Sequence, residues 1–443
     1  MAKQTQLRRG TTTEHNSFTG AVGEVTVDTS KDTAVVHDGS TVGGHALALE
    51  KNVPNGANSA ITDDGTNIIV AGTINGTTIV GAYGLSWNES TDTYIRTGSS
   101  EYTQIQQNMR RCVLKDDGTV HYYLNATDSS YKENGIASDL TGADGNVMVE
   151  IPKFYYKYSY TGTTHSWSIS SVPFAGYSVH PAFIKGGVEV AHRYIGAYTA
   201  STDGTILKSV SGEYCDCSMT RGTMRDRARN IGTGWGIQDW NLISAVQLLM
   251  LIEFGTFKSQ TAIGMGRTQL SGGSWADGSY YAINGLSNNI GNATGCVNYS
   301  GDADDAGADL AYMSYRGIEH FYGNVWSWVD GINVQDNVPY INNNPATFAD
   351  DVFSGDYVSA GITMINSNGW QNTLAQVGTG FYPVSVGAND STKISDYYWQ
   401  NSGNRVVKLG GAASDGSYAG AFCLAAYYAS SYSAAHIGSV LAF

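Results

Sequence analysis

Acidic side chains gather in one segment at a spacing that could bind a metal ion. The segment GDADDAGAD, residues 301–309, places Asp302, Asp304 and Asp305 as a calcium-binding loop would. It lacks the glutamate that closes a twelve-residue EF-hand loop, so a solvated acidic loop is the default interpretation. We therefore predict a protein without a cofactor and keep a calcium ion in this segment as the alternative.

The sequence carries no motif that predicts catalysis. Gly-x-Ser-x-Gly and His-Glu-x-x-His are both absent. The five cysteines are irregularly spaced, and Cys215 and Cys217 are too close for an ordinary bridge. Cys423, between Phe422 and Leu424, is expected to be a buried, inert thiol. We predict reduced cysteines and no enzyme activity, although two carboxylates that meet only in space and cleave a glycan remain an alternative.

The segment 410–443 has a composition that fits a binding surface. Asp415 is its only formally charged side chain, whereas a flexible tail would carry more charge and a core strand more Val and Ile. Tyr, Ser and Gly dominate antibody combining sites, where Tyr gives contact area at low entropic cost. The predicted receptor-binding residues are Ala413, Ser414, Ser417, Tyr418, Tyr427, Tyr428, Ser430, Ser431, Tyr432 and His436. A core position is the alternative for Tyr427 and Tyr428, and the expected core residues are Phe422, Leu424, Leu441 and Phe443.

Charge and hydropathy argue against two classes of partner. The chain has 25 Lys and Arg against 39 Asp and Glu, which gives a net charge of −14. We predict no nucleic-acid partner for such a chain, because phosphate binding needs clustered basic residues. No run of 18 apolar residues exists, so no membrane insertion is predicted, and the basic N-terminus has no apolar segment of a signal peptide.

The elements that must position these residues are mostly strands and turns. High glycine (54) and tyrosine (29) contents favour a mainly β protein rich in loops. Alternating residues predict two short strands over 25–36 and a strand pair over 146–160. Residues 240–257 are predicted to form one amphipathic helix that ends near Gly255. The expected division is an N-terminal module (1–50), a β-rich linker or small sheet (51–82), an intermediate β-rich region (83–145) and a C-terminal domain (146–443).

The N-terminal module resembles a known family. The string QLRRGTTTEHNSFTGAVGEVTVDTSKDTAVVHDGSTVGGHALA, Gln6 to Ala48, is similar to the N-terminal domain of the major tropism determinant family of phage tail-fibre proteins. So short a segment with few large apolar residues cannot bury an adequate core alone, which by itself indicates oligomerisation. The resemblance implies a β-prism built by three chains, hence a homotrimer, that attaches to other tail proteins of the virion.

The C-terminal domain carries a second resemblance. GNVWSWVDGI, residues 323–332, resembles the core signature of C-type-lectin-like folds in formylglycine-generating enzymes and retroelement-diversified proteins. The helix at 240–257, IPKFYYK, HPAF and the closing glycines agree with it. The resemblance implies an α+β domain of this fold whose last residues form a diversified face. Two positions depart from the pattern: Ala413 stands where Trp is common, and Val440 stands where Arg is common.

These observations predict a phage tail-fibre tip adhesin. Residues 410–443 lack Lys, Glu, Gln, Met and Trp. A codon AAC or AAT whose adenines are randomised cannot encode any of these five residue types. Their absence is therefore typical of retroelement diversification. The expected partner is a bacterial surface protein or glycan, and the expected location is the virion tail fibre, after synthesis in the host cytoplasm. The alternatives are a tail-associated polysaccharide-degrading enzyme and a purely structural fibre segment.

Overall fold

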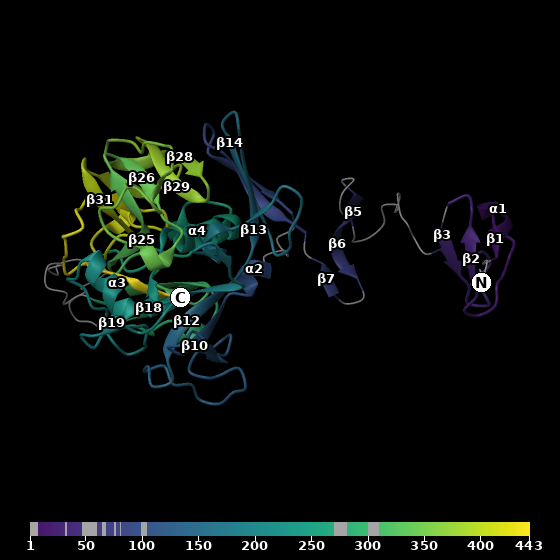
Figure 1. Ribbon diagram of the computed structural model, residues 1–443, viewed down its shortest axis with the longest axis horizontal. Coiled ribbons are helices and arrows are strands. Elements are labelled where there is room, and N and C mark those ends of the chain that lie inside the picture. The colour runs from purple at the N-terminus through teal and green to yellow at the C-terminus, as the bar shows by residue number, and fades with distance from the viewer. Residues whose placement is uncertain are drawn as a thin grey trace. The chain divides into compact units, whose positions relative to one another are not determined.

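The chain divides into two compact units, Met1–Ile79 and Val80–Phe443. The structure, a computed structural model, describes residues 8–31, 33–46, 60–63, 68–74, 77–79, 81–98, 104–269, 281–299 and 310–443. The first unit is coloured from purple to blue in Figure 1, and the second from blue to yellow. The acidic segment with Asp302, Asp304 and Asp305 lies outside the described residues.

The first unit contains a small four-stranded sheet. Its strands, in sheet order, are β1 (Arg9–Gly10), β2 (Val25–Asp28), β3 (Thr33–Val36) and β4 (His45–Ala46). The two strands predicted over 25–36 are confirmed as the antiparallel pair β2 and β3. The one-turn helix α1 (Thr12–His15) begins with a capping box, in which Thr11 and Glu14 bond each other's backbone N–H. Within 51–82, β5 (Ala60–Asp63), β6 (Ile68–Ile74) and β7 (Thr77–Ile79) form a second, antiparallel sheet.

Polar side chains occupy the interior of the first unit. Thr26 Oγ1 lies 2.8 Å from His15 Nε2 and 2.9 Å from His37 Nε2, and all three residues are buried. Such hydrogen bonds satisfy the buried groups but add little apolar burial. Among the side chains described in residues 8–45, Val35 is the only buried apolar one.

Three large sheets build the second unit. The six-stranded sheet runs β11 (Val120–Tyr123), β10 (Arg110–Leu114), β12 (Asn146–Pro152), β18 (His192–Thr199), β34 (Val440–Ala442) and β21 (Gly236–Ile237). The five-stranded sheet runs β15 (Ser178–Val179), β13 (Tyr155–Thr161), β14 (Thr164–Ser170), β8 (Tyr83–Asn88) and β9 (Thr93–Thr97). The nine-stranded sheet contains β27 (Val358–Ser359), β26 (Val338–Ile341), β25 (Trp326–Gln335), β31 (Asn404–Leu409), β32 (Leu424–Ala426), β30 (Tyr397–Gln400), β28 (Gly369–Val377), β29 (Gly380–Val386) and β33 (Ile437–Gly438).

Shorter elements complete the second unit. The small sheets are β16 (Ile184–Lys185) with β17 (Val188–Glu189), β19 (Ser201–Thr202) with β20 (Leu207–Lys208), and β22 (Gly295–Tyr299), β23 (Leu310–Tyr315) and β24 (Ile318–Glu319). The α-helices are α2 (Gln104–Gln107), α3 (Arg221–Arg229), α4 (Trp240–Phe254) and α5 (Ser259–Ala262). The 3₁₀ turns are η2 (Pro181–Phe183), η3 (Asn288–Ile290), η4 (Pro345–Thr347) and η5 (Gly416–Tyr418).

The strand pair predicted over 146–160 is wrong in its pairing. Both strands form, but β12 pairs with β10 and β18, whereas β13 pairs with β14 and β15 in another sheet. Every residue of β12 before Pro152 is buried, so it is a central strand and not one half of a hairpin. Strands from residues 83–145 join both sheets, since β8 pairs with β14 and β10 with β12.

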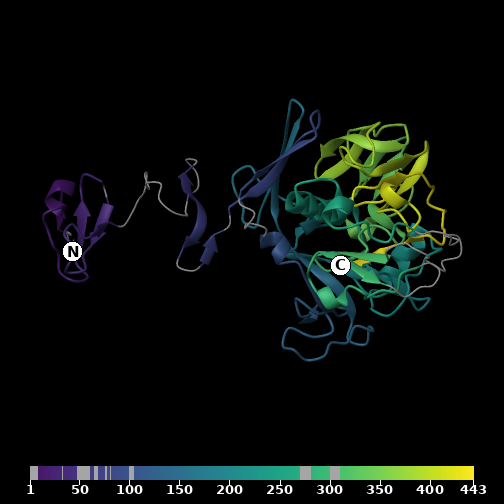
Figure 2. The same cartoon turned by 180° about the vertical axis from the view of Figure 1, so that it is seen from behind.

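The predicted helix forms, but its predicted amphipathic character is wrong. Helix α4 begins after Asp239, whose side chain accepts from the N–H of Leu242 at 3.0 Å, and ends at Gly255 in the left-handed region. All residues from Trp240 to Ile252 are buried, and α4 lies among the strands of the second unit (Figures 1 and 2). Its polar residues are bonded inside the core: Gln247, for instance, donates to the carbonyl of Ala421 at 2.8 Å.

The last strand of the chain, β34, lies inside the six-stranded sheet. Strand β34 pairs antiparallel with β18 on one side and with β21 on the other. Leu441 is fully buried there, and Val440, the residue in the usual place of an arginine, is buried in the apolar core. The mainly β class with an α+β C-terminal domain is thus confirmed.

Candidate functional site

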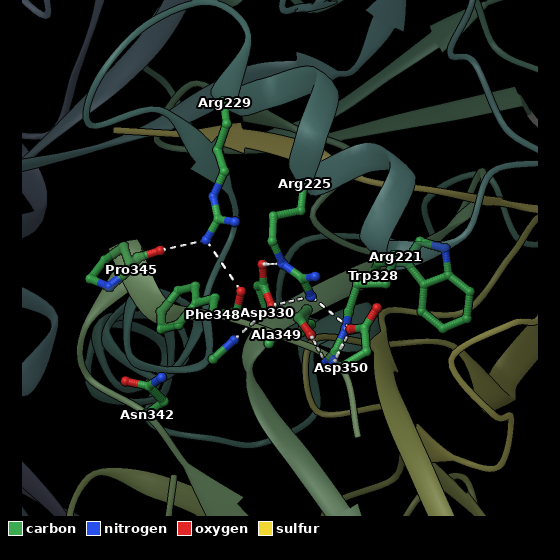
Figure 3. A network of polar contacts seen from close by, with 12 residues as sticks. Arg221, Arg225, Arg229, Trp328, Asp330, Asn342, Pro345, Phe348, Ala349 and Asp350 are labelled. Carbon is green, nitrogen blue, oxygen red and sulfur yellow. Dashed lines mark hydrogen bonds and ion pairs between the residues drawn. The ribbon is translucent and has the colours of Figure 1, made fainter. Parts of the chain in front are cut away.

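A network of two buried arginines, one buried carboxylate and one half-buried carboxylate fixes the strand that carries the GNVWSWVDGI string (Figure 3). Arg225, from α3, donates to Asp330 Oδ2 at 2.6 Å and to Asp350 Oδ1 at 2.7 Å. Arg221, one turn earlier, donates to Asp350 Oδ1 at 2.7 Å and to the carbonyls of β25. Burial alone would raise the pKa of Asp350, but the two guanidinium groups outweigh it and lower that pKa. Two positive and two negative groups therefore neutralise each other between α3, β25 and Asp350.

The string itself plays two structural roles. Val325, Trp326 and Trp328 are buried, and the Trp328 indole donates to the carbonyl of Met219 at 3.0 Å. Asn324 has the positive φ of a turn residue (60°). Asp330 lies within β25 as the partner of Arg225.

The tail returns beside β25 and is held by one buried carboxylate. β32 pairs with β31, and β33 pairs with β25. Asp396 is buried, and its Oδ2 accepts from the N–H of Phe422 at 2.7 Å. Burial raises the pKa of Asp396 well above its usual value, while backbone N–H groups of the tail oppose that rise. The carboxyl group thus fixes the chain just before β32.

Gly420 is required at this contact. A Cβ added there would lie 2.1 Å from Asp396 Oδ1, well inside the van der Waals distance. We expect Gly420→Ala to lower the free energy of unfolding by about 1–3 kcal/mol through overpacking. Urea unfolding measures the loss, and Gly236→Ala is the control, because Gly236, like Gly420, lacks positive φ but has open space where a Cβ would be added. An unchanged stability for Gly420→Ala would contradict the close approach.

The structure divides the predicted receptor-binding residues into three groups. Ser414, Tyr418, Tyr427 and Ser431 are exposed, with Tyr418 at 42% and Tyr427 at 37%. Ser417, Tyr428, Ser430 and Tyr432 are half-buried. Ala413 is fully buried and His436 almost so.

Ala413 is a correction to the prediction. Its N–H donates to the carbonyl of Asn324 at 2.9 Å, so it belongs to the frame beneath the surface and its side chain cannot meet a receptor. His436 is also part of the interior, although it lines a cavity that opens to solvent. Tyr427 is exposed and not core, while Phe422, Leu424 and Leu441 are buried as expected and Phe443 is half-buried.

Aromatic side chains form two clusters on the tail and the neighbouring strands. Tyr428 and Tyr432 stack at 3.7 Å between ring centroids, and Tyr427 meets Tyr428 edge-on at 5.0 Å. Tyr418 lies within 4.6–5.7 Å of three rings from β28 and β30: Trp370, Tyr397 and Trp399. Aromatic groups with one exposed side supply large contact areas with little loss of side-chain entropy.

A cavity of about 360 Å³ connects these clusters. It is lined by Trp326, Asn368, Trp399, Lys408, Ala412, Ser414, Asp415, Ala425, Tyr427, Tyr428 and His436. Lys408, on β31, is only 5% exposed, and its Nζ lies 3.9 Å from the centre of the Trp326 ring and 5.0 Å from that of Tyr428. Burial lowers the pKa of Lys408 to about 7, although the Asp415 carboxylate opposes the shift.

Sequence reasoning missed Lys408, Trp399 and Trp326 as site residues. Lys408 and Trp399 precede residue 410, and the GNVWSWVDGI string indicates only a core position for Trp326. A signal did exist for Lys408: it is a charged residue in RVVKLGG, an otherwise apolar strand pattern. A charge at such a position is rarely buried without a function or a partner.

Other chemistry is limited in the described part of the chain. All five cysteines are free thiols, and burial raises the pKa of Cys423 well above its usual value. No group of three or more His, Cys, Asp or Glu residues that could hold a metal ion occurs within the described ranges. A larger cavity, about 610 Å³, lies between η2, α4 and residues 341–382, and its lining includes four asparagines and five glycines besides Trp240 and Tyr382. Among the described helices, none is long and apolar enough to cross a membrane.

Comparison with known proteins identifies the class of the N-terminal domain. Residues 5–41 match the family described as Major tropism determinant N-terminal domain. Over 48 residues the chain is 58% identical to the protein named "Tail fiber receptor-binding protein" of Bordetella phage BPP-1. That match is 11% of this chain and spans 13% of the length of the phage protein. The predicted N-terminal resemblance is thus confirmed.

Solved structures give a weaker likeness over the whole chain. The P3c and M1 variants of the Major Tropism Determinant align with 99% of this chain and 98% of theirs, each at 17% identity. Their TM-scores are 0.26 and 0.27. Scores of this size do not establish a common fold for the C-terminal unit.

Proposed function

We propose that this chain is a phage tail-fibre adhesin that attaches to a receptor on a bacterial surface without chemistry. The observation that carries the proposal is the group of partly exposed tyrosines, Tyr418, Tyr427, Tyr428 and Tyr432, on a rigid frame. A domain of the Major tropism determinant family in the same chain supports the tail-fibre context. The receptor is a surface protein or glycan.

The frame of the face is proposed to be a C-type-lectin-like domain. In its favour, the tail lies in the sheet of the Trp326–Gln335 strand and ends in a strand that pairs with β18. The N-terminal module is proposed to form a homotrimer that attaches to other tail proteins. Three copies would raise the affinity of a weak site by avidity.

The direct test is binding of the purified chain to bacteria that adsorb the parent phage. The triple substitution Tyr427→Ala, Tyr428→Ala and Tyr432→Ala should reduce cell binding about 100-fold or more, because central tyrosines carry a large share of interface energy. Flow cytometry with labelled protein measures the loss. The wild-type chain should also block phage adsorption.

The control is Tyr131→Ala together with Tyr160→Ala, two exposed tyrosines outside the tail, which should leave binding unchanged. Circular dichroism checks that each variant is folded. Full cell binding by the folded triple variant would overturn the tail as the receptor face. Release of new reducing ends from the bacterial polysaccharide would instead overturn attachment without chemistry.

A further inference from the structure

Lys408 is a buried ammonium group held by aromatic rings. Its side chain is 5% exposed, and within the described ranges its Nζ has neither a hydrogen bond nor an ion pair. The Trp326 and Tyr428 rings contact it instead, through cation–π interactions. A cation–π contact stabilises a desolvated ammonium group by less than the free-energy cost of burying an unpaired charge. A negative group on a ligand would therefore stabilise the buried ammonium further.

The nearest carboxylate compensates the charge of Lys408 only in part. Asp415 lines the same cavity, and its carboxylate opposes the lowering of the Lys408 pKa without forming a direct ion pair with Nζ. Its Oδ2 accepts from the N–H of Ala412 at 2.6 Å, which orients it toward the backbone of its own turn. Burial raises the pKa of Asp415, so this carboxylate itself lies in an unfavourable environment.

The walls of the cavity select the rest of the ligand. Trp326, Trp399, Tyr427 and Tyr428 present aromatic faces, while Asn368 and Ser414 add polar groups. About 360 Å³ lies at the lower end of small-ligand sites, which combine apolar walls with a few orienting polar groups. Sugar rings match such walls, since their C–H faces pack on aromatic rings and their hydroxyls bond to polar side chains.

We propose that this cavity binds an acidic sugar of the bacterial surface, with the sugar carboxylate on Lys408 and its ring against Trp326 and Trp399. The inference deepens the proposed function by naming a ligand class for the same face. A phosphate fits less well, because it carries more negative charge beside Asp415 and no arginine fork lines the cavity.

The test is titration of the full chain with methyl glycosides of glucuronic, galacturonic and N-acetylneuraminic acid. Each is compared with its own methyl ester, which has the same ring but no charge. We expect at least one acid to bind about 10- to 100-fold more tightly than its ester, the range of a charge-assisted hydrogen bond. Calorimetry or ligand-observed NMR measures both dissociation constants.

Three variants locate the site. Lys408→Met should abolish the preference for the acid. Asp415→Asn also removes a carboxylate that favours the ammonium form of Lys408, so it is titrated well below pH 7, where Lys408 keeps its proton. There it should strengthen acid binding about threefold by removing a like charge. The matched control is Lys132→Met, because Lys132 Nζ also lies over a ring, 4.0 Å from the centre of Tyr122, but outside this cavity. It should leave all affinities unchanged.

Affinity should also depend on pH with a definite sign. Binding needs the ammonium form of Lys408, whose pKa is about 7 in the free protein, so affinity falls about tenfold per unit as pH rises above that value. The other titratable groups facing the ammonium are Asp415, His436, Tyr428 and Cys423. Burial lowers the pKa of His436 to about 4 and raises those of the other three. His436, Tyr428 and Cys423 therefore do not change their charge near pH 8.

Two results would overturn the inference: no acid binds better than its ester, or Lys408→Met retains the preference. Its failure is separable from that of the proposed adhesin. Cell binding that proteases abolish and acidic sugars do not inhibit leaves an adhesin with a protein receptor. Acidic-sugar binding by a chain that attaches to no bacterium retains the site and overturns the adhesin.

Discussion

Replacing Asp330 by alanine should lower the free energy of unfolding of the C-terminal unit by about 3–5 kcal/mol. The change removes one of the two carboxylates that balance Arg221 and Arg225, so the two buried guanidinium groups must share Asp350 and one positive charge is no longer neutralised. Arg225 also loses a two-pronged contact, 2.6 and 2.9 Å from the two oxygens of Asp330. Urea unfolding followed by tryptophan fluorescence measures the effect.

The control for this substitution is Glu189→Ala, which breaks an ion pair of similar length, 2.5 Å to Lys153, on the surface. Water screens that pair, so its loss should change stability by less than about 1 kcal/mol. Equal effects for the two substitutions would contradict a central role for the network. The network should also weaken in acid, because the pKa of Asp350 is lower in the folded protein than in the unfolded one. The contribution of Asp350 to stability is complete above its unfolded-state pKa. It is lost as pH falls through its folded-state pKa.

The fold could be predicted from the sequence where the signal is local. β2 and β3 follow from alternation, and α4 follows from its length, its Asp239 cap and Gly255. The sheet partners of β12 could not be predicted, because a fully buried strand carries no alternation to tell which neighbours it pairs with. The burial of α4 was also hidden, since Ser244 and Gln247 look like part of a polar face but bond to other core groups, Thr379 and the carbonyl of Ala421.

The site was only partly predictable for a similar reason. The tail's composition indicated a binding surface, and Tyr418 and Tyr427 are exposed there. Composition does not reveal direction, so it also indicates Ala413, although that side chain faces the interior. Lys408 and Trp399 come from other strands, and only pairing of β31 and β30 with β32 brings them beside the tail.

Lys408→Met should raise the free energy of unfolding by about 2–4 kcal/mol at pH 6, while it removes the proposed ligand site. Methionine keeps the unbranched stem beside Trp326 but carries no charge. The sign follows from the lowered pKa. Below about pH 7 the folded protein must hold a charged Lys408 in the interior, and this penalty is complete.

As pH rises from about 7 toward the unfolded-state value of 10.5, the folded lysine is neutral and the unfolded one still binds its proton, so the penalty shrinks. The stability difference between Lys408→Met and the wild type should therefore decrease over this range and vanish above it. Groups that both proteins share cancel in that difference. Thermal unfolding at several pH values and one protein concentration measures it, with Lys132→Met as a control that should show no such trend. A less stable Lys408→Met at pH 6 would mean that the ammonium has a strong internal partner, and that the cavity is built for stability and not for a ligand.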